Sequence, residues 1–437
     1  MSATAIPAVV LSCIGAPEGD LSLVRSLGEQ GVPVIVLSEY GHSPSRRSRY
    51  CRAFLEVPDF ASNPSSLLRT LREVRERLGT APVLFPSADP DLAALLDLDG
   101  QLDGLVRRTL PPAALAHQLL DKHGFEALAL QEDLPVPRSL AVGDAERGEV
   151  LPDWRAHCAR LRFPLVAKPV WSHAWQTDTV PQSVRSAKAL HLADMADVEA
   201  LAASLPTASW ACTLLQEYVP GSDDEHFGVH AYIDREGRVL GTSVTRNWRV
   251  YPPHAGGGCC MESIHEPTLE AQALDALRRV GFRGGIANMD YKRNAQTGEF
   301  RLLEINPRIS QAHILSTRAG VNFPWLAWRD ACGLPPLPPP SRRIGVRYIN
   351  ELDDLLARRR YAREGQWRWP SYLRHVLGPG RVYQLTQLHD LAPLGSALRY
   401  LSHRLLVRRG GRTPFDPNRP PPVLDWRPIE ALRVHLA

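Results

Sequence analysis

The sequence predicts a protein of mixed α/β and α+β class, and three observations support this prediction. Apolar runs alternate with helical segments near the N-terminus, a strand-rich region fills the middle, and the end is helical in pattern and rich in arginine. At 437 residues the chain is too long for one ordinary core, so length alone predicts two to four domains.

The N-terminal region predicts a small Rossmann-like domain with a parallel sheet. Short apolar runs and helical patterns alternate in a β-α-β order, at residues 8–15, 21–31, 32–38, 65–78 and 81–96. No G-x-G-x-x-G follows the first strand, so a dinucleotide site is not supported. A ligand of this domain would lie at the carboxyl ends of its strands.

Prolines mark the expected domain boundaries. Pro111 and Pro112 can begin a helix but not continue one, and the segment "GLPPLPPPSRR" at 333–343 reads as a stiff linker. Helical patterns follow the linker at 351–363 and 394–409, ahead of a proline-rich stretch. We therefore expect an N-terminal domain, a central domain with two lobes, and a C-terminal extension, at residues 1–110, 111–335 (lobes 138–213 and 214–335) and 336–437.

A predicted hairpin, "IANMDYKRNAQTGEFRLLEINPR", carries polar residues on an otherwise apolar strand. Successive strand side chains alternate between faces, so Glu304 and Asn306 project from one face, and Pro307 ends the strand before Arg308. If Asp290 pairs with Glu304, Asp290 shares that face as well. The sequence alone leaves this register open.

Two carboxylates and a carboxamide oxygen on one face would repel one another unless a cation lay between them. Such hard oxygen ligands suit Mg²⁺, which takes a few carboxylates together with waters and phosphate oxygens. The alternative is a hairpin whose polar side faces solvent. The apolar character of "LLEINPR" argues against it, because burying unpaired carboxylates is costly.

Bulk composition excludes several classes of protein. No apolar run reaches the ~20 residues of a membrane helix, and the first residues lack the basic start and cleavage site of a signal peptide, so we expect a cytoplasmic protein. The seven cysteines are scattered without a C-x-x-C pair, which favours reduced thiols. From residue 336 onward 18 arginines and 8 acids give a net charge of +10, but no nucleic-acid-binding module is recognisable, so we expect no nucleic acid partner.

The order of the motifs resembles the ATP-grasp superfamily, and within it the carboxylate:amine (thiol) ligase branch. The resemblance covers residues 1–335 and is carried by four segments, "LLDKHGFEALALQEDLPVP", "FPLVAKP", "LLQEYVPGSDDE" and "MDYKRNAQTGEFRLLEINPR". It implies an ATP-grasp fold, in which two α+β lobes grip ATP. It also implies the phosphorylation of a carboxylate to an acylphosphate, followed by attack of an amine.

The resemblance also assigns roles to residues. Lys122 and Lys168 would contact the phosphates of ATP, with Lys168 also catalytic. The side chain of Gln216 and the backbone of Glu217 and Val219 would form hydrogen bonds with adenine. Asp223 would hold the ribose, with Asp224 and Glu225 as substitutes. Mg²⁺, or Mn²⁺ as a second candidate, would be bound by Asp290, Glu304 and Asn306. Arg308 would stabilise the transferring phosphoryl group and contact the substrate.

The sequence defines the binding site of the substrates less well than that of ATP. Arg246 or Arg249 would bind the substrate carboxylate through a bidentate guanidinium contact, the alternative being two surface arginines. The segment after Lys168 departs from the family pattern, because it has no glycine-rich flap to close over the phosphates. The three glycines Gly256 to Gly258 predict a loop.

Three functions remain open on the sequence. The first is a ligase that joins a small-molecule carboxylate to an amine. The second keeps the fold but phosphorylates a hydroxyl or forms a thioester, and the third is a nucleotide-binding regulator without turnover. The partners we expect are these small molecules, and a homodimer and a carrier protein are candidate assemblies.

Overall fold

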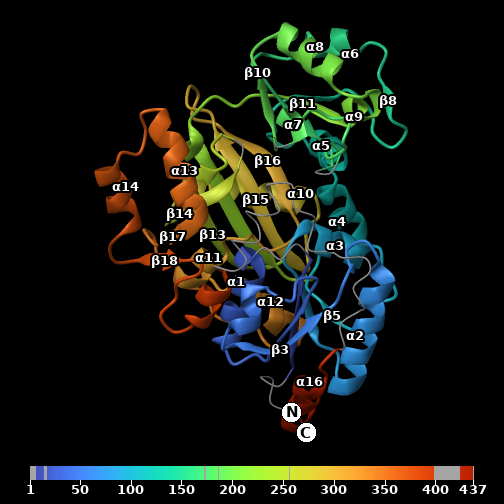
Figure 1. Cartoon of the computed structure of the whole chain (residues 1–437), viewed down its shortest axis with the longest axis vertical. Coiled ribbons are helices and arrows are strands. Elements are labelled where there is room, and N and C mark those ends of the chain that lie inside the picture. The colour runs from blue at the N-terminus through green and yellow to red at the C-terminus, as the bar shows by residue number, and fades with distance from the viewer. Residues whose placement is uncertain are drawn as a thin grey trace.

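The computed structural model describes residues 6–13, 17–171, 174–185, 187–254, 256–397 and 424–436. Three sheets organise these residues, with a small two-stranded ribbon in addition. Figure 1 shows the N-terminal sheet at one end of the molecule, the largest sheet in the centre and a smaller lobe at the other end. No helix within the described ranges is both long and apolar enough to cross a membrane.

The N-terminal sheet is parallel, as the β-α-β pattern predicts. Its strand order is β3-β2-β1-β4-β5, and the bounds are β1 Ala8–Ser12, β2 Val34–Ser38, β3 Cys51–Glu56, β4 Val83–Pro86 and β5 Arg107–Arg108. The helices that flank it are α1 Pro17–Gly28, α2 Pro64–Leu78 and α3 Asp89–Leu96. Because α3 begins directly after β4, Asp89 lies at the carboxyl edge of this sheet. This is the edge at which open α/β sheets bind ligands.

Two short helices, α4 (Ala113–Leu120) and α5 (Lys122–Gln131), lead into the smaller lobe. Its sheet has the order β10-β9-β11-β6, with β6 Ser139–Ala141, β9 Leu165–Pro169, β10 Leu190–Leu192 and β11 Thr213–Glu217. The remaining elements of the lobe are β7 Gly143–Asp144, β8 Glu149–Val150, α6 Trp154–Cys158, α7 Gln182–Arg185, α8 Met195–Ser204 and α9 Thr207–Ala211. The atypical segment after Lys168 is anchored here, since Trp175 is fully buried and its indole donates to Thr213 Oγ1 at 3.2 Å.

The central sheet has seven strands in the order β16-β15-β12-β13-β14-β17-β18. Their bounds are β12 His226–Ile233, β13 Val239–Tyr251, β14 Gly257–Ile264, β15 Gly285–Arg293, β16 Phe300–Asn306, β17 Arg347–Ile349 and β18 Arg381–Tyr383. Phe227, Val229, Met289 and other apolar residues on one face join a core with α10 (Pro267–Arg279) and the α4–α5 pair. The opposite face carries Asn288, Asp290 and their polar neighbours, because strand side chains alternate. The glycines expected to form a loop instead begin β14 at Gly257.

Helices α11 (Ile314–Arg318) and α12 (Phe323–Ala331) fill the junction between the central sheet and the N-terminal domain. Phe323 and Trp328 pack there against Tyr232 and Ile286 of the sheet and Val10 of β1. This packing fixes the carboxyl edge of the N-terminal sheet relative to the central sheet.

The C-terminal region is helical in large part, through α13 (Glu351–Arg363), α14 (Trp369–Val376) and α16 (Arg427–Leu436), and it also adds β17 and β18 to the central sheet. Buried ion pairs help to fix it to the rest of the chain. Asp354 of α13 pairs with Arg249 of β13, and Asp390 pairs with Arg25 of α1, with all four side chains almost completely buried. Helix α16 packs on α2 (Figure 1). Most of the helix expected at 394–409 and residues 412–423 of the proline-rich stretch lie outside the described residues.

Candidate active site on the polar face of the central sheet

The hairpin register that the sequence left open is now fixed. Asp290 pairs with Glu304 and Asn288 pairs with Asn306, so all four side chains share the polar face. Asn306 Nδ2 lies 3.0 Å from Glu304 Oε1 and 3.5 Å from Asp290 Oδ2. The two carboxyl groups and the amide therefore converge on one spot, as that register predicts.

The electrostatics of this spot suit a cation. Burial, followed by the negative charge of Glu304, raises the pKa of Asp290 well above its usual range. Burial also acts to raise the pKa of Glu304, but hydrogen bonds from Asp290 and Asn306 and the charges of Lys122 and Lys168 outweigh it, so this pKa is lowered. Burial and the charge of Glu304 both disfavour the negative charge of Asp290, and a cation bound between the two carboxylates would offset both effects.

The donor set consists of two carboxylates and one carboxamide oxygen. Among the residues that the structure describes, no three His, Cys, Asp or Glu side chains gather in a group that could hold a metal. A site built on Asp290, Glu304 and Asn306 would therefore leave most of the coordination sphere to water and ligand oxygens. Mg²⁺ tolerates this better than an ion that needs a full protein cage.

Lys168 approaches the carboxylates from the smaller lobe. Its Nζ donates to Gln216 Oε1 at 2.8 Å, and the charges nearest to it include Glu304 and Asp290. Burial lowers the pKa of Lys168, although the charge of Glu304 opposes this effect. Lys122 begins α5, and its Nζ lies 3.4 Å from the carbonyl oxygen of Val170. The structure thus brings both lysines to the carboxylate side of the smaller lobe.

Gln216 lies between Lys168 and Glu126. Its amide bridges two side chains, since Oε1 accepts from Lys168 and Nε2 donates to Glu126 Oε1 at 3.0 Å. The side chain thus supports Lys168, and its contact with adenine stays a prediction. Glu217 is the last residue of β11, and its side chain accepts a hydrogen bond from the Arg162 N–H at 2.9 Å. Val219, two residues further along the chain, is buried.

The three acids after Gly221 all have partners. Asp223 Oδ2 accepts from the Tyr361 hydroxyl at 2.5 Å and from the His254 N–H at 3.0 Å. Asp224 pairs with Arg246 at 2.9 Å. Tyr361 belongs to α13, so the C-terminal region reaches the residue expected to hold ribose.

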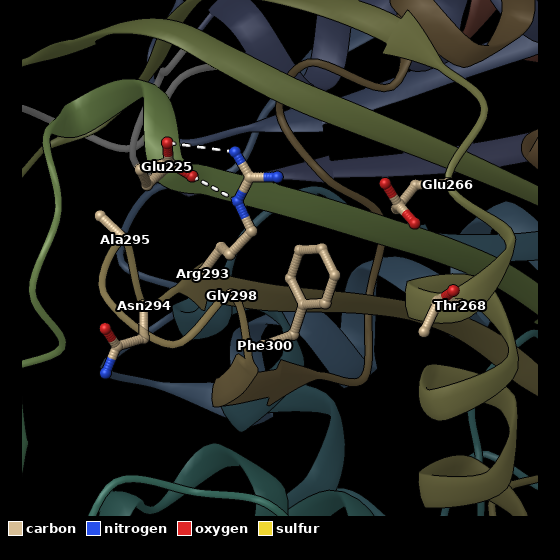
Figure 2. Close-up of a pocket in the computed structure, with 8 residues that line it drawn as sticks. All are labelled: Glu225, Glu266, Thr268, Arg293, Asn294, Ala295, Gly298 and Phe300. Carbon is tan, nitrogen blue, oxygen red and sulfur yellow. Dashed lines mark hydrogen bonds and ion pairs between the residues drawn. The ribbon is translucent and has the colours of Figure 1, made fainter.

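Glu225 faces a different part of the molecule. Both of its carboxylate oxygens bind Arg293, at 2.7 and 3.2 Å (Figure 2). The pair lines a pocket of about 390 Å³ together with Phe300 and the hairpin turn. Because Arg293 follows Lys292 on β15, this pocket lies on the face opposite Asp290, which makes Glu225 a poor substitute for Asp223.

The two arginines expected to bind the substrate carboxylate are both engaged. Arg249 is fully buried and forms a bidentate pair with Asp354, at 2.6 and 3.0 Å. The prediction that Arg249 contacts substrate is therefore wrong, because its charge is neutralised inside the protein. Arg246 is partly exposed and donates to Asp224, with Trp248 beneath its guanidinium.

Arg308 lies where the strand pattern places it, but with a partner that the sequence did not indicate. Its Nε and Nη2 bind the two carboxylate oxygens of Asp89, at 2.5 and 2.8 Å, and its Nη1 donates to the Ile309 carbonyl. A guanidinium has five N–H groups, so two remain for a ligand. The pair connects the N-terminal domain to the carboxylate site.

Sequence reasoning missed further residues. Lys292 could have been found, because it lies two residues after Asp290 and so shares the polar face. Asp89, Glu126 and Tyr361 carry no local signal, since each reaches the site through a contact between residues 90 or more positions apart.

The chain is similar to known proteins in sequence and in fold. Residues 214–352 match the family model described as ATP-grasp in the biosynthetic pathway with Ter operon. The fold is similar to an ADP complex of N5-carboxyaminoimidazole ribonucleotide synthetase, at 16% identity and a TM-score of 0.58, covering 83% of this chain and 87% of that one. It is also similar to L-amino acid ligase from Bacillus licheniformis, at 13% identity and a TM-score of 0.55, covering 75% and 74%. The chain therefore has the ATP-grasp fold, and the resemblance found in its sequence is confirmed.

Two curated relatives are similar in sequence. D-aspartate ligase from Enterococcus faecium is 26% identical over an alignment of 295 residues that covers 64% of this chain and 66% of that protein. The carbamoyl phosphate synthase large chain from Thermus thermophilus is 24% identical over an alignment of 341 residues that covers 70% of this chain. This chain spans only 31% of that second protein.

Proposed function

We propose that this chain is an ATP- and Mg²⁺-dependent ligase that couples a carboxylate to an amine, with release of ADP and phosphate. The observation that carries the proposal is the convergence of Asp290, Glu304 and Asn306 on one face, opposite Lys168. The relatives named D-aspartate ligase and L-amino acid ligase support the reaction class.

The donor set fits Mg²⁺, with Mn²⁺ as the alternative. Asp290, Glu304 and Asn306 would hold the ion. A metal ion held there would supply positive charge to offset the negative charge that develops during phosphoryl transfer. The raised pKa of Asp290 supports this role, because a cation would offset the burial and the charge of Glu304 that raise it.

In the first step, an oxygen of the substrate carboxylate would attack the γ-phosphorus of ATP. The bond from that phosphorus to the bridging oxygen breaks, ADP leaves, and an acylphosphate forms. Lys122 and Lys168 would hold the phosphates, and the two remaining N–H groups of Arg308 would bind the transferring group. Such fixed charges need no reorganisation during the reaction.

In the second step, the amine nitrogen would attack the acyl carbon. The carbon–oxygen bond to phosphate breaks, phosphate leaves, and the nitrogen loses a proton to yield the amide. Both substrates are small molecules in this proposal. A homodimer and a carrier protein stay predictions.

The test is to incubate the protein with ATP, Mg²⁺ and pooled carboxylates and amines, and to follow phosphate release together with mass spectrometry. Phosphate release with a condensed product supports ligation. A phosphorylated alcohol or a thioester would favour the second reading of the sequence. Tight ATP binding without turnover would favour a regulator.

Replacing Asp89 with asparagine tests the proposed role of Arg308. The change keeps the size of the side chain but removes the charge that holds the guanidinium on both oxygens. We expect kcat to fall about 10- to 100-fold with little change in KM for ATP, because a misaligned cation mainly weakens the transition state. Steady-state kinetics with varied ATP would measure both constants.

Asp97→Asn is the matched control, since Asp97 is exposed at the end of the same helix. A kcat for Asp89→Asn equal to that of the control would refute the role given to this pair.

A further inference from the structure

Helix α14 carries an exposed apolar stripe that the proposed reaction does not use. Trp369 and Leu373 lie one turn apart on one side of the helix, and Leu377 follows its last residue. Their exposed fractions are 51%, 43% and 58%. Tyr372 is buried, with its ring 5.0 Å from the Arg249 guanidinium, so the helix is held to the protein by a different side. A contiguous row of large apolar side chains in water marks an interaction surface.

Arginines adjoin this stripe. Arg368 and Arg374 are exposed and are the sequence neighbours of Trp369 and Leu373. From residue 358 to residue 381 the chain has seven arginines and one acid, a net charge of +6. That acid, Glu364, lies 3.3 Å from His254. The stripe therefore lies in a strongly positive part of the chain.

Helix α13 brings further positive charge to the stripe. The Arg358 guanidinium lies 3.4 Å from the centroid of the Trp369 ring, so the end of α13 packs beside α14. Arg359, Arg360 and Arg363 are exposed near that end. Figure 1 shows the two helices side by side at the outer edge of the molecule. The apolar stripe and these charges are thus close together at that edge.

The combination of leucine, tryptophan and arginine distinguishes between partners. A nucleic acid would attract the arginines, but aliphatic leucines offer no stacking surface to its bases. A second copy of the same surface would bring positive charge against positive charge. An anionic lipid bilayer satisfies all three residue types, with phosphates for arginine, hydrocarbon for leucine and the headgroup boundary for tryptophan.

We infer that α14 and the end of α13 form a docking surface for an anionic lipid bilayer. Trp369, Leu373 and Leu377 enter the boundary between headgroups and acyl chains, and the surrounding guanidinium groups bind lipid phosphates. The inference goes beyond the proposed function, because it uses no residue of the proposed ATP site and does not depend on the reaction.

Co-sedimentation of the full chain with vesicles tests the inference. The vesicles contain phosphatidylcholine alone or mixed with phosphatidylglycerol, which is anionic. We expect the mixed vesicles to bind the protein at least about tenfold more tightly than the neutral ones. Raising the salt concentration from about 0.1 M to about 0.5 M should weaken this binding at least about fivefold, because exposed charges are screened.

Leu373→Ser with Leu377→Ser should weaken binding to the mixed vesicles at least about tenfold, because less apolar surface leaves water on docking. Both side chains are largely exposed, so the variant should keep the thermal unfolding midpoint of the wild type. Leu130→Ser with Ile344→Ser is the matched control. It removes two apolar side chains that are 75% and 67% exposed outside the stripe, and it should bind like the wild type.

Arg359→Gln with Arg363→Gln should weaken binding to the mixed vesicles about tenfold and leave binding to the neutral ones unchanged. Equal binding of the wild type to both vesicles, binding to neither, or unchanged binding of the leucine variant would overturn the inference. So would tighter binding to an oligonucleotide than to the mixed vesicles. A wild-type dimer that the leucine variant converts to a monomer in light scattering would assign the stripe to a second copy instead.

Discussion

Glu304→Ala is expected to lower turnover at least about 1000-fold, the largest loss that the proposed mechanism predicts for a single residue. Glu304 supplies one of two carboxylates at the spot where Asp290 and Asn306 converge. Without it the ion would lose a charged ligand, and the charge on the transferring phosphoryl group would be left without compensation. Phosphate release under saturating ATP would measure the effect.

Binding of the base should survive this change. Adenine is expected to contact Gln216, Glu217 and Val219 and not Glu304, so ADP affinity without Mg²⁺ should stay within about threefold of the wild type. Glu299→Gln, at an exposed position at the start of the same hairpin strand, is the control. Full activity in Glu304→Ala would refute the metal assignment.

Asp354→Ala is expected to destabilise the folded protein by about 3–5 kcal/mol, because it leaves the charge of Arg249 buried without a partner. The two side chains have no measurable exposure, and their two hydrogen bonds are 2.6 and 3.0 Å long. The midpoint of thermal unfolding should fall by at least about 5 °C. Differential scanning fluorimetry would measure it.

Two further variants make this prediction specific. The double variant Arg249→Met with Asp354→Leu replaces both charges by apolar groups of similar size, and it should recover much of the lost stability. Arg363→Ala removes an exposed arginine from the same helix and should change the midpoint little. If Asp354→Ala melts like Arg363→Ala, α13 is not held to the central sheet by this pair.

The polar face was predictable because its signals are local. Strand alternation places Glu304 and Asn306 together, and a hairpin with a short turn leaves few registers for Asp290. The parallel N-terminal sheet was predictable for the same reason, since each β-α-β unit is contiguous in the chain.

Other features depend on contacts between distant segments. Arg246 and Arg249 lie on the same strand, and no residue near them in the sequence indicates that Arg249 is buried. The position of α13 places Asp354 against Arg249. Arg308 meets Asp89 because α12 packs the central sheet against the N-terminal domain, which no local pattern encodes. The glycines before Cys259 form the start of β14 because pairing with β13 outweighs their weak strand propensity.

The central claim is that Asp290, Glu304 and Asn306 hold a divalent ion that also binds the nucleotide. Calorimetric titration of ADP with Mg²⁺ and with EDTA, on the wild type and on Asp290→Ala, tests it most directly. We expect Mg²⁺ to tighten ADP binding at least about tenfold in the wild type and to have little effect in the variant. An equal gain in both proteins, or no gain in the wild type, would contradict it.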